Sequence, residues 1–354
     1  MEEAMILSEM GHLESDNGKA RLQVRVIGIG GAGGDIVRCM MRLFNIPGVS
    51  YSLIDMKASG IPSDLTPSQS SIAELFSGLY GRDTVVEATS APSFASKVRD
   101  WVGNANVVVI AAGMGGRTGT GASPVVARIA RKTSALVLAF VNVPDRFEGE
   151  KANQAAMEGI VCLGAEVDKM IILSRDCLLE LRAQHHGSNP FAVEEKTMSE
   201  GIAGMLEPLN VPGLVDPHPG DIERVMSIPG EGDMSVGEGR GAQPALEAAE
   251  AALRGPMSCA RVGKAKGLLL YFRGNGDIPL QEYAEALELI AGEARPDADI
   301  VFGVSNPVEG LQMLHEGLCT RVRLTLIATG LESTLHSSTP TWLRRYVWES
   351  RRRL

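Results

Sequence analysis

The stretch "NVVVIAAGMGGRTGTGASPVVARIAR", residues 106–131, does most to limit the possible folds of this chain. Its apolar start predicts a buried strand over 106–112, and its end predicts a helix over 123–132. Between them, glycine or threonine fills six of the seven positions from Gly115 to Gly121, with Arg117 as the exception. Small side chains let backbone N–H groups approach a ligand closely, and the start of a helix favours an anion.

A second glycine-rich turn follows the apolar segment 22–29, and a helix is expected after it. Gly28, Gly30 and Gly33 satisfy G-x-G-x-x-G, and Asp55 ends the next predicted strand, 49–55, where a ribose-binding acid would lie. This pattern alone indicates a dinucleotide-binding dehydrogenase, and the alternative is a tight turn that binds nothing. Two such turns suit a longer polyphosphate better, with Thr118 and Thr120 as hydroxyl donors. There is no G-x-x-x-x-G-K-[ST], so a P-loop enzyme is excluded.

The remaining periodicity predicts an α/β protein. Strands alternate with helices at a spacing that implies a parallel sheet with helices on both faces. A second, smaller α/β unit follows a glycine-rich segment, 228–244, which we interpret as a loop or hairpin. The further predicted strands are 135–143, 169–174, 266–273, 298–304 and 321–330. The further predicted helices are 72–79, 149–167, 189–209, 245–253 and 280–293.

Composition excludes several classes of function. The chain has 354 residues, 44% of them hydrophobic, so a large core and one to three domains are expected. A net charge of −9 argues against a nucleic-acid partner. The five cysteines form no CxxC, which indicates free thiols in a reducing cytoplasm and no metal site. No apolar run reaches the length of a membrane span, and residues 1–20 are predicted to be a disordered leader.

The motifs together resemble the tubulin/FtsZ superfamily. "GMGGRTGTG" is similar to the signature GGGTGTG, with flanks like the bacterial FtsZ form, and "VIGIGGAGGDIV" is similar to the first FtsZ glycine loop. "VPDRFEGEKANQAAMEGI", "VPGLVDPHPGDIERVM" and "LIATGLE" extend the resemblance over residues 22–331. It implies a Rossmann-like GTPase domain at 21–190, a central helix with its following loop at 191–222, and a smaller α/β C-terminal domain at 223–332.

The resemblance also implies ligands and partners. GTP or GDP is the expected cofactor, with Mg2+ as a candidate companion ion, and further copies of the chain are expected to join head to tail in a filament. The nucleotide-binding residues implied are Gly30, Gly31, Ala32, Gly33, Gly34, Asp35, Gly113, Met114, Gly115, Gly116, Arg117, Thr118, Gly119, Thr120, Gly121, Glu148, Arg175 and Glu195.

The catalytic loop departs from the family pattern. In FtsZ-like filaments this loop enters the neighbouring subunit's pocket with the pattern N-x-D-x-x-D; here those places hold Asp216, His218 and Asp221. An imidazole lacks the fixed charge that orients a water cluster, and losing such a group commonly costs about two to four orders of magnitude in rate. Hydrolysis is therefore expected to be slow or absent. The alternative is that His218 is an ordinary loop residue and Asp216 replaces the missing acid.

The expected pocket departs as well. Residues 57–85 show no counterpart of the family's glycine-rich segment, and Ala152 stands where the family has an arginine. The family's base-reading acid aligns with Lys196, leaving Glu195 or Glu194 as substitutes, and Arg175 replaces an asparagine. Arg117 either reaches polyphosphate oxygens in compensation or folds over an empty pocket, as in a nucleotide-independent scaffold.

The segment 333–354 is predicted to be a basic amphipathic tail. Basic residues beside aromatic ones suit the surface of an anionic membrane, so we expect the protein at the inner face of the cytoplasmic membrane. The alternative is that the tail packs on the protein's own acidic surface or on a neighbouring filament. The membrane-binding candidates are Trp342, Leu343, Arg344, Arg345, Tyr346, Val347, Trp348, Arg351, Arg352 and Arg353.

Overall fold

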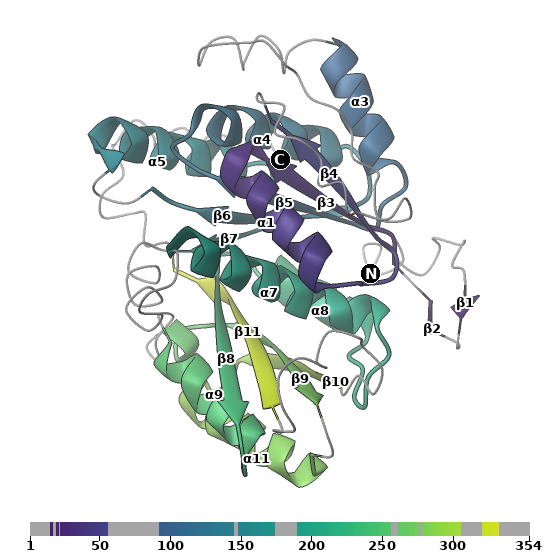
Figure 1. The fold of residues 1–354 in the computed structure, drawn as a ribbon, viewed down its shortest axis with the longest axis vertical. Coiled ribbons are helices and arrows are strands. Elements are labelled where there is room, and N and C mark those ends of the chain that lie inside the picture. The colour runs from purple at the N-terminus through teal and green to yellow at the C-terminus, as the bar shows by residue number, and fades with distance from the viewer. Residues whose placement is uncertain are drawn as a thin grey trace. The chain divides into compact units, whose positions relative to one another are not determined.

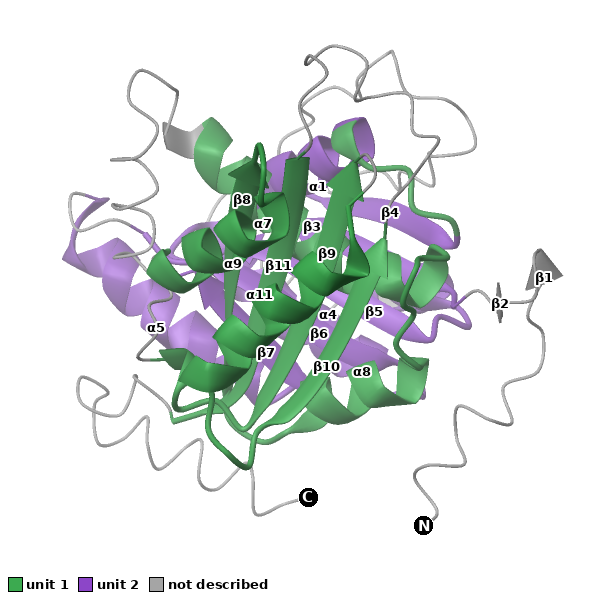
Figure 2. Ribbon diagram, turned by 90° about the horizontal axis from the view of Figure 1, so that it is seen from below, with its two compact units in different colours: residues 1–21, 43–47, 176–332 green, residues 22–42, 48–175, 333–354 purple. Residues whose placement is uncertain are grey.

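The structure is a computed structural model that describes residues 22–55, 92–144, 148–173, 190–255, 261–275, 278–305 and 321–332, with two short strands before them. Figure 1 shows the elements, and Figure 2 colours the two compact units into which the chain divides. One unit comprises residues 22–42, 48–175 and 333–354, and we call it the glycine-loop unit. The other comprises residues 1–21, 43–47 and 176–332, and we call it the α7 unit.

The sheet of the glycine-loop unit is parallel throughout, as the sequence predicts. Its strands are β3 (Val24–Ile29), β4 (Val49–Ile54), β5 (Val107–Gly113), β6 (Leu136–Asn142) and β7 (Lys169–Leu173). They lie in the order β7-β6-β5-β3-β4. β5 and β6 are buried along nearly their whole length, which explains why these two central strands read as near-continuous apolar runs.

The described helices of this unit are α1 (Gly30–Leu43), α3 (Pro92–Val102), α4 (Arg117–Ala130) and α5 (Glu150–Gly164). The main core cluster joins α3, α4 and α5 to one set of alternating strand residues, such as Ile27 and Ile29 of β3. The helix predicted at 123–132 begins six residues earlier, at Arg117, and α1 begins within the predicted turn, at Gly30. Glycine and threonine have weak helix propensity, so the starts of α1 and α4 that we predicted from the sequence are too late.

The α7 unit combines a mixed four-stranded sheet with helices. Its strands are β8 (Glu231–Arg240), β9 (Gly267–Asn275), β10 (Asp299–Ser305) and β11 (Arg321–Leu331), in the order β10-β9-β11-β8. β9 and β10 are parallel, and β11 is antiparallel to both β8 and β9. Its helices are α7 (Pro190–Asn210), α8 (Pro219–Ser227), α9 (Pro244–Arg254) and α11 (Leu280–Glu293). α7 packs against the sheet, and α9 packs on β8, β11 and α11.

The prediction of a loop or hairpin at 228–244 is wrong, because this segment contains the ten-residue strand β8. Its glycines are required by packing. A Cβ at Gly237 would lie 2.0 Å from the Ala248 carbonyl oxygen, and one at Gly239 would lie 2.1 Å from that of Pro244. The backbone of α9 therefore rests directly on the strand. Glycine here reflects the close approach of a helix, which the sequence could not distinguish from a loop.

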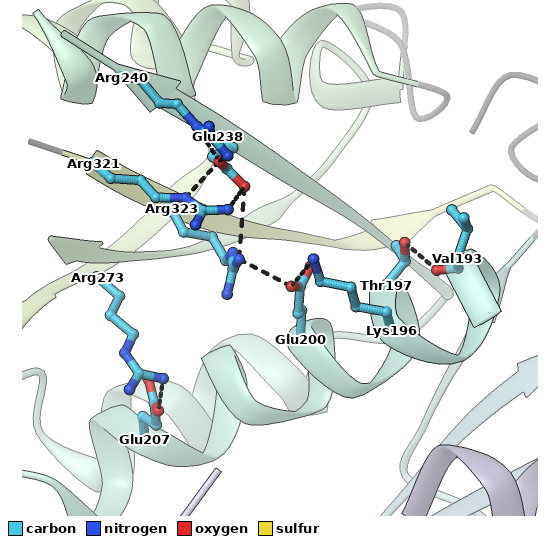
Figure 3. Close-up of polar contacts among 10 residues, drawn as sticks. All are labelled: Val193, Lys196, Thr197, Glu200, Glu207, Glu238, Arg240, Arg273, Arg321 and Arg323. Atoms are coloured by element: carbon cyan, nitrogen blue, oxygen red, sulfur yellow. Dashed lines mark hydrogen bonds and ion pairs between the residues drawn. The ribbon is translucent and has the colours of Figure 1, made fainter. Parts of the chain in front are cut away.

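Charged side chains join α7 to its sheet (Figure 3). Glu207 of α7 contacts Arg273 of β9 at 2.6 Å, and Glu200 of α7 contacts Arg323 of β11 at 3.0 Å. Burial raises the pKa of Glu207, although the Arg273 guanidinium opposes this. Burial also acts on Glu238 of β8, but hydrogen bonds from neighbouring arginines hold the pKa of Glu238 at about 2. Along α7, Glu200 and Glu207 lie on either side of Gly201 and Gly204, where the helix meets Met234 and Thr325 too closely for a Cβ.

Some predicted segments lie outside the described residues. These are the short helix at 72–79, the tail at 333–354 and most of the leader, where Ser15–Asp16 and Lys19–Ala20 form a small antiparallel pair. The contact boundary falls between Arg175 and Asp176, and the predicted domain limits at 190 and 222 stay predictions. No helix in the described part of the chain combines the length and apolar character needed to cross a membrane.

Replacing Gly237 by alanine is expected to destabilise the protein by about 1–3 kcal/mol, because the new methyl group overlaps the α9 backbone. Urea unfolding followed by circular dichroism measures this. The matched control is Gly292→Ala in α11, where an added Cβ meets nothing within 4 Å; it should be neutral or stabilising by up to about 1 kcal/mol. Equal unfolding midpoints for the two variants would contradict this account of β8.

Candidate nucleotide-binding site

The starts of α1 and α4 meet at the carboxyl edge of the parallel sheet. β3 and β5 are adjacent and in register, with Ile29 beside Ala112, so the turns after them leave the sheet side by side. Gly30 has φ +75°, and a Cβ there would lie 3.2 Å from the Gly119 nitrogen. The two predicted glycine turns are therefore in contact. Their backbone N–H groups share one region, as a site for a bound anion requires.

The glycines of the two turns divide into two groups. Gly33, Gly113 and Gly119 are required by packing; for example, a Cβ at Gly33 would lie 2.1 Å from the Ala111 carbonyl oxygen. Gly31 and Gly116 are different, because both are exposed and an added Cβ would meet no atom of the described residues within 4 Å. Packing of the protein does not explain these two, so the open space beside them fits a ligand that approaches the backbone.

Within the described part of the chain, no side chain caps the N-terminus of α4. Gly116 is the N-cap residue, with extended backbone (φ −77°, ψ 159°), and no side chain forms a capping hydrogen bond there. The first N–H groups of any helix lack an intrahelical acceptor and need another partner. The oxygens of a phosphate chain are suitable acceptors, so the residues present fit the polyphosphate of GTP or GDP.

Thr120 closes the loop before α4. Its Oγ1 accepts a hydrogen bond from the Gly115 N–H at 2.9 Å, and the Met114 N–H donates to the Asn142 carbonyl oxygen. These two backbone donors are therefore engaged within the protein. The sequence suggested the Thr120 hydroxyl as a hydrogen-bond donor to phosphate. In the structure its oxygen accepts a hydrogen bond that shapes the loop, a role that a motif alone does not reveal.

Arg117 is the first residue of α4, and its side chain is exposed. A cation at this end of a helix opposes the helix dipole, which favours negative charge. No ion-pair partner of Arg117 is found among the described residues. An anion bound at Gly116 would offset this repulsion, because it attracts both the Arg117 guanidinium and the positive end of the helix dipole.

The other predicted nucleotide ligands lie in several places. Ala32 borders Gly113, and Gly115 approaches the Ala152 carbonyl oxygen of α5, so the start of α5 also reaches this region. Glu148 is exposed just before α5. Asp35 pairs with Arg38 at 2.6 Å. The remaining predicted residues of the turns are Gly34, Thr118 and Gly121, all within α1 or α4. Glu195 lies half-buried in α7, in the other unit, and Arg175 lies outside the described residues.

Two family models match this chain. Residues 23–183 match the family model "Tubulin/FtsZ family, GTPase domain", and residues 230–332 match "FtsZ family, C-terminal domain". The chain belongs to the tubulin/FtsZ family. This family binds GTP or GDP, and its fold accounts for the parallel sheet and the mixed second sheet.

Solved structures of this family share the fold over nearly the whole chain. An empty FtsZ dimer from M. jannaschii is 24% identical with a TM-score of 0.74, covering 93% of this chain and 91% of that one. CetZ2 from Haloferax volcanii, described as a GTPγS-bound protofilament, is 16% identical with a TM-score of 0.67, covering 94% and 98%. A CetZ from Methanosaeta thermophila is also 16% identical, with a TM-score of 0.68 and coverage of 94% and 93%.

The three candidate catalytic residues lie at the start of α8. The Asp216 carboxylate accepts a hydrogen bond from the Gly213 N–H at 2.9 Å, and Asp221 pairs with Arg224 at 3.0 Å. His218 is the N-cap of α8, with its Nδ1 accepting from the Gly220 N–H at 3.1 Å. The imidazole thus does the capping work usually done by a short polar side chain. We did not predict this helix from the sequence, although Pro219 at its first position is a signal that could have located its start.

Replacing Thr120 by valine is expected to destabilise the protein by about 1 kcal/mol, because the Gly115 N–H loses its acceptor while the side-chain volume is kept. Thermal or urea unfolding measures the change. Thr120→Ser is the matched control, since it retains the hydroxyl oxygen and should keep most of the stability. If valine and serine gave the same result, the hydrogen bond would not be what holds the loop.

Proposed function

We propose that this chain binds GTP or GDP at the meeting point of α1 and α4 and polymerises head to tail into protofilaments. The observation that carries the proposal is the uncapped start of α4 in contact with the start of α1, at two glycines whose missing side chains leave open space. Family membership supports guanine nucleotide as the ligand. Filament formation is supported by the FtsZ-type C-terminal domain and by the CetZ2 structure, which is described as a protofilament.

Charge supports a polyphosphate at this site. Two helix N-termini converge, and each carries a partial positive charge. Arg117 adds a full charge beside Gly116, where the side chain is exposed and able to reach a ligand. A guanidinium binds phosphate oxygens with two parallel hydrogen bonds in favourable geometry. These observations support Arg117 as a ligand contact over the alternative that it folds across an empty pocket.

Gly116→Ala is expected to weaken GTP binding about tenfold or more while lowering stability by no more than about 1 kcal/mol, the cost of a poorer N-cap. The backbone at Gly116 suits alanine, and the new methyl group meets no atom of the described residues, but it occupies the ligand's space and blocks contact with the N–H groups. Fluorescent GTP, GDP and ATP analogues give the affinities, and thermal unfolding without nucleotide gives the stability. An unchanged GTP affinity would place the nucleotide elsewhere.

Negative-stain microscopy of the purified wild type, with and without GTP, is expected to show straight or paired protofilaments that depend on nucleotide. Filaments of equal abundance without nucleotide, together with no GTP binding, would favour the nucleotide-independent scaffold instead. Monodisperse monomers in every nucleotide and salt condition would contradict assembly altogether.

We further propose that hydrolysis is weak. The α8 start is the segment that enters the next subunit's pocket in FtsZ-like filaments, and it offers His218 where the family has an acid. The Nδ1 atom is engaged in capping α8, and Asp221 is engaged with Arg224. His218 and Asp221 therefore do not supply two free carboxylates to orient an attacking water. Mg2+ stays a candidate companion ion of the nucleotide.

His218→Asp is expected to raise GTP turnover by at least about tenfold, because it restores a fixed negative charge while keeping a good N-cap. Phosphate release at matched filament concentration is the measurement. His218→Asn is the matched control, since asparagine caps α8 equally well but adds no charge, and its turnover should stay near the wild-type value. Brisk wild-type turnover that aspartate does not change would overturn the proposal.

A membrane role rests on sequence alone, because the tail lies outside the described residues. Residues 341–354 carry five arginines and one glutamate, and two of the three tryptophans of the chain. Each basic residue contributes roughly 1 kcal/mol near an anionic surface, so single copies bind weakly and filaments bind by avidity. We propose that the polymer binds anionic membrane directly.

Full-length filaments are expected to pellet with anionic liposomes and much less with neutral ones. A chain ending at residue 338 should lose this difference, because the basic and aromatic residues are removed. Co-sedimentation at matched polymer content measures both. Equal pelleting of the two chains with anionic liposomes would remove the tail from the mechanism and leave packing against the protein itself as its role.

A further inference from the structure

An ion pair lies beside the first glycine turn. Asp35 follows Gly30 by five residues in α1, so its Cα lies about 7.5 Å along the helix axis from the helix start. Helical side chains lean towards the N-terminus, which brings the carboxylate closer still. The Asp35 side chain is 46% exposed. A fixed negative charge within about one Debye length of a bound polyphosphate would weaken its binding.

Arg38 lies over the same end of the helix. Its Nη1 is 2.6 Å from the Asp35 Oδ1, and only 18% of its side chain is exposed. The same Nη1 lies 3.3 Å from the position that a Cβ on Gly34 would occupy. The missing side chain at Gly34 therefore makes room for the guanidinium. The last glycine of the turn and the arginine fit together, which places a positive charge against the negative charge of Asp35.

We propose that Arg38 is a positioning residue of the nucleotide site: it offsets the charge of Asp35, so that a nucleotide polyphosphate can bind at the start of α1. The inference rests on the proposed function. With the two charges paired, the helix dipole and the backbone N–H groups decide the local potential, and that potential favours an anion. Arg38 thus acts through Asp35 and needs no contact with the ligand.

A double-mutant cycle on the full-length protein tests this role, with a fluorescent GTP analogue and inorganic tripolyphosphate as probes. Arg38→Gln should weaken binding of both about tenfold at low ionic strength, because it leaves the Asp35 carboxylate uncompensated. Asp35→Asn combined with Arg38→Gln should return the affinity to within about threefold of the wild type. The loss in Arg38→Gln should shrink at high salt, which screens the charge.

Two variants serve as controls. Arg254→Gln removes an arginine from an ion pair of the same length on α9, with Glu250 at 2.6 Å, and changes the net charge equally, although Arg254 is more exposed than Arg38; it should leave both affinities unchanged. Arg38→Lys keeps the charge and should bind within about threefold of the wild type. Thermal unfolding of each variant shows whether it is folded.

The outcomes separate the two proposals. Wild-type binding with no loss in Arg38→Gln would overturn the inference and leave the proposed function standing. A double variant as weak as Arg38→Gln would also overturn it, because Arg38 would then act on the ligand itself. If the wild type bound neither probe, both the proposed function and this inference would fail.

Discussion

The N-termini of α1 and α4, both partly positive, are held together at the edge of one parallel sheet. The rest of the glycine-loop unit is arranged around that contact. β3 and β5 are neighbours in register, so α1 and α4 must begin side by side. Each helix start carries roughly half a positive elementary charge, and the two starts repel each other. The buried strands, the core cluster that includes α4 and the buried face of α1 hold the arrangement in place. A polyphosphate is the ligand that would turn this repulsion into attraction.

The α7 unit solves a different problem, which is to hold a long helix against a sheet that carries many charges. Gly201 and Gly204 bring the helix backbone close to Met234 and Thr325, and acids on either side reach arginines of β9 and β11. Such partly buried pairs cost desolvation, so they specify the position of the helix more than they add to stability. The small residues set the distance, and the charges set the position.

Sequence reasoning recovered the parts of the fold that depend on local pattern. Apolar runs bounded by glycine located the parallel strands, and the motif order led to the family. It failed where one residue type serves two purposes. Gly237 reads as a loop residue, yet it lies under α9; Gly119 and Gly116 look alike in the motif, yet one is required by packing and the other faces open space. Only the packed neighbours distinguish them, and those neighbours are distant in sequence.

The capping role of His218 separates the stability of the α8 start from the chemical reactivity of the side chain at that position. Aspartate and asparagine satisfy the same helix start that the imidazole Nδ1 satisfies here, so α8 keeps its geometry whichever residue is present. A side chain of different reactivity can therefore occupy this position without loss of folding stability. Under the proposed role of this loop in hydrolysis, substitutions at position 218 would change how long a bound nucleotide survives while leaving the stability of α8 nearly unchanged.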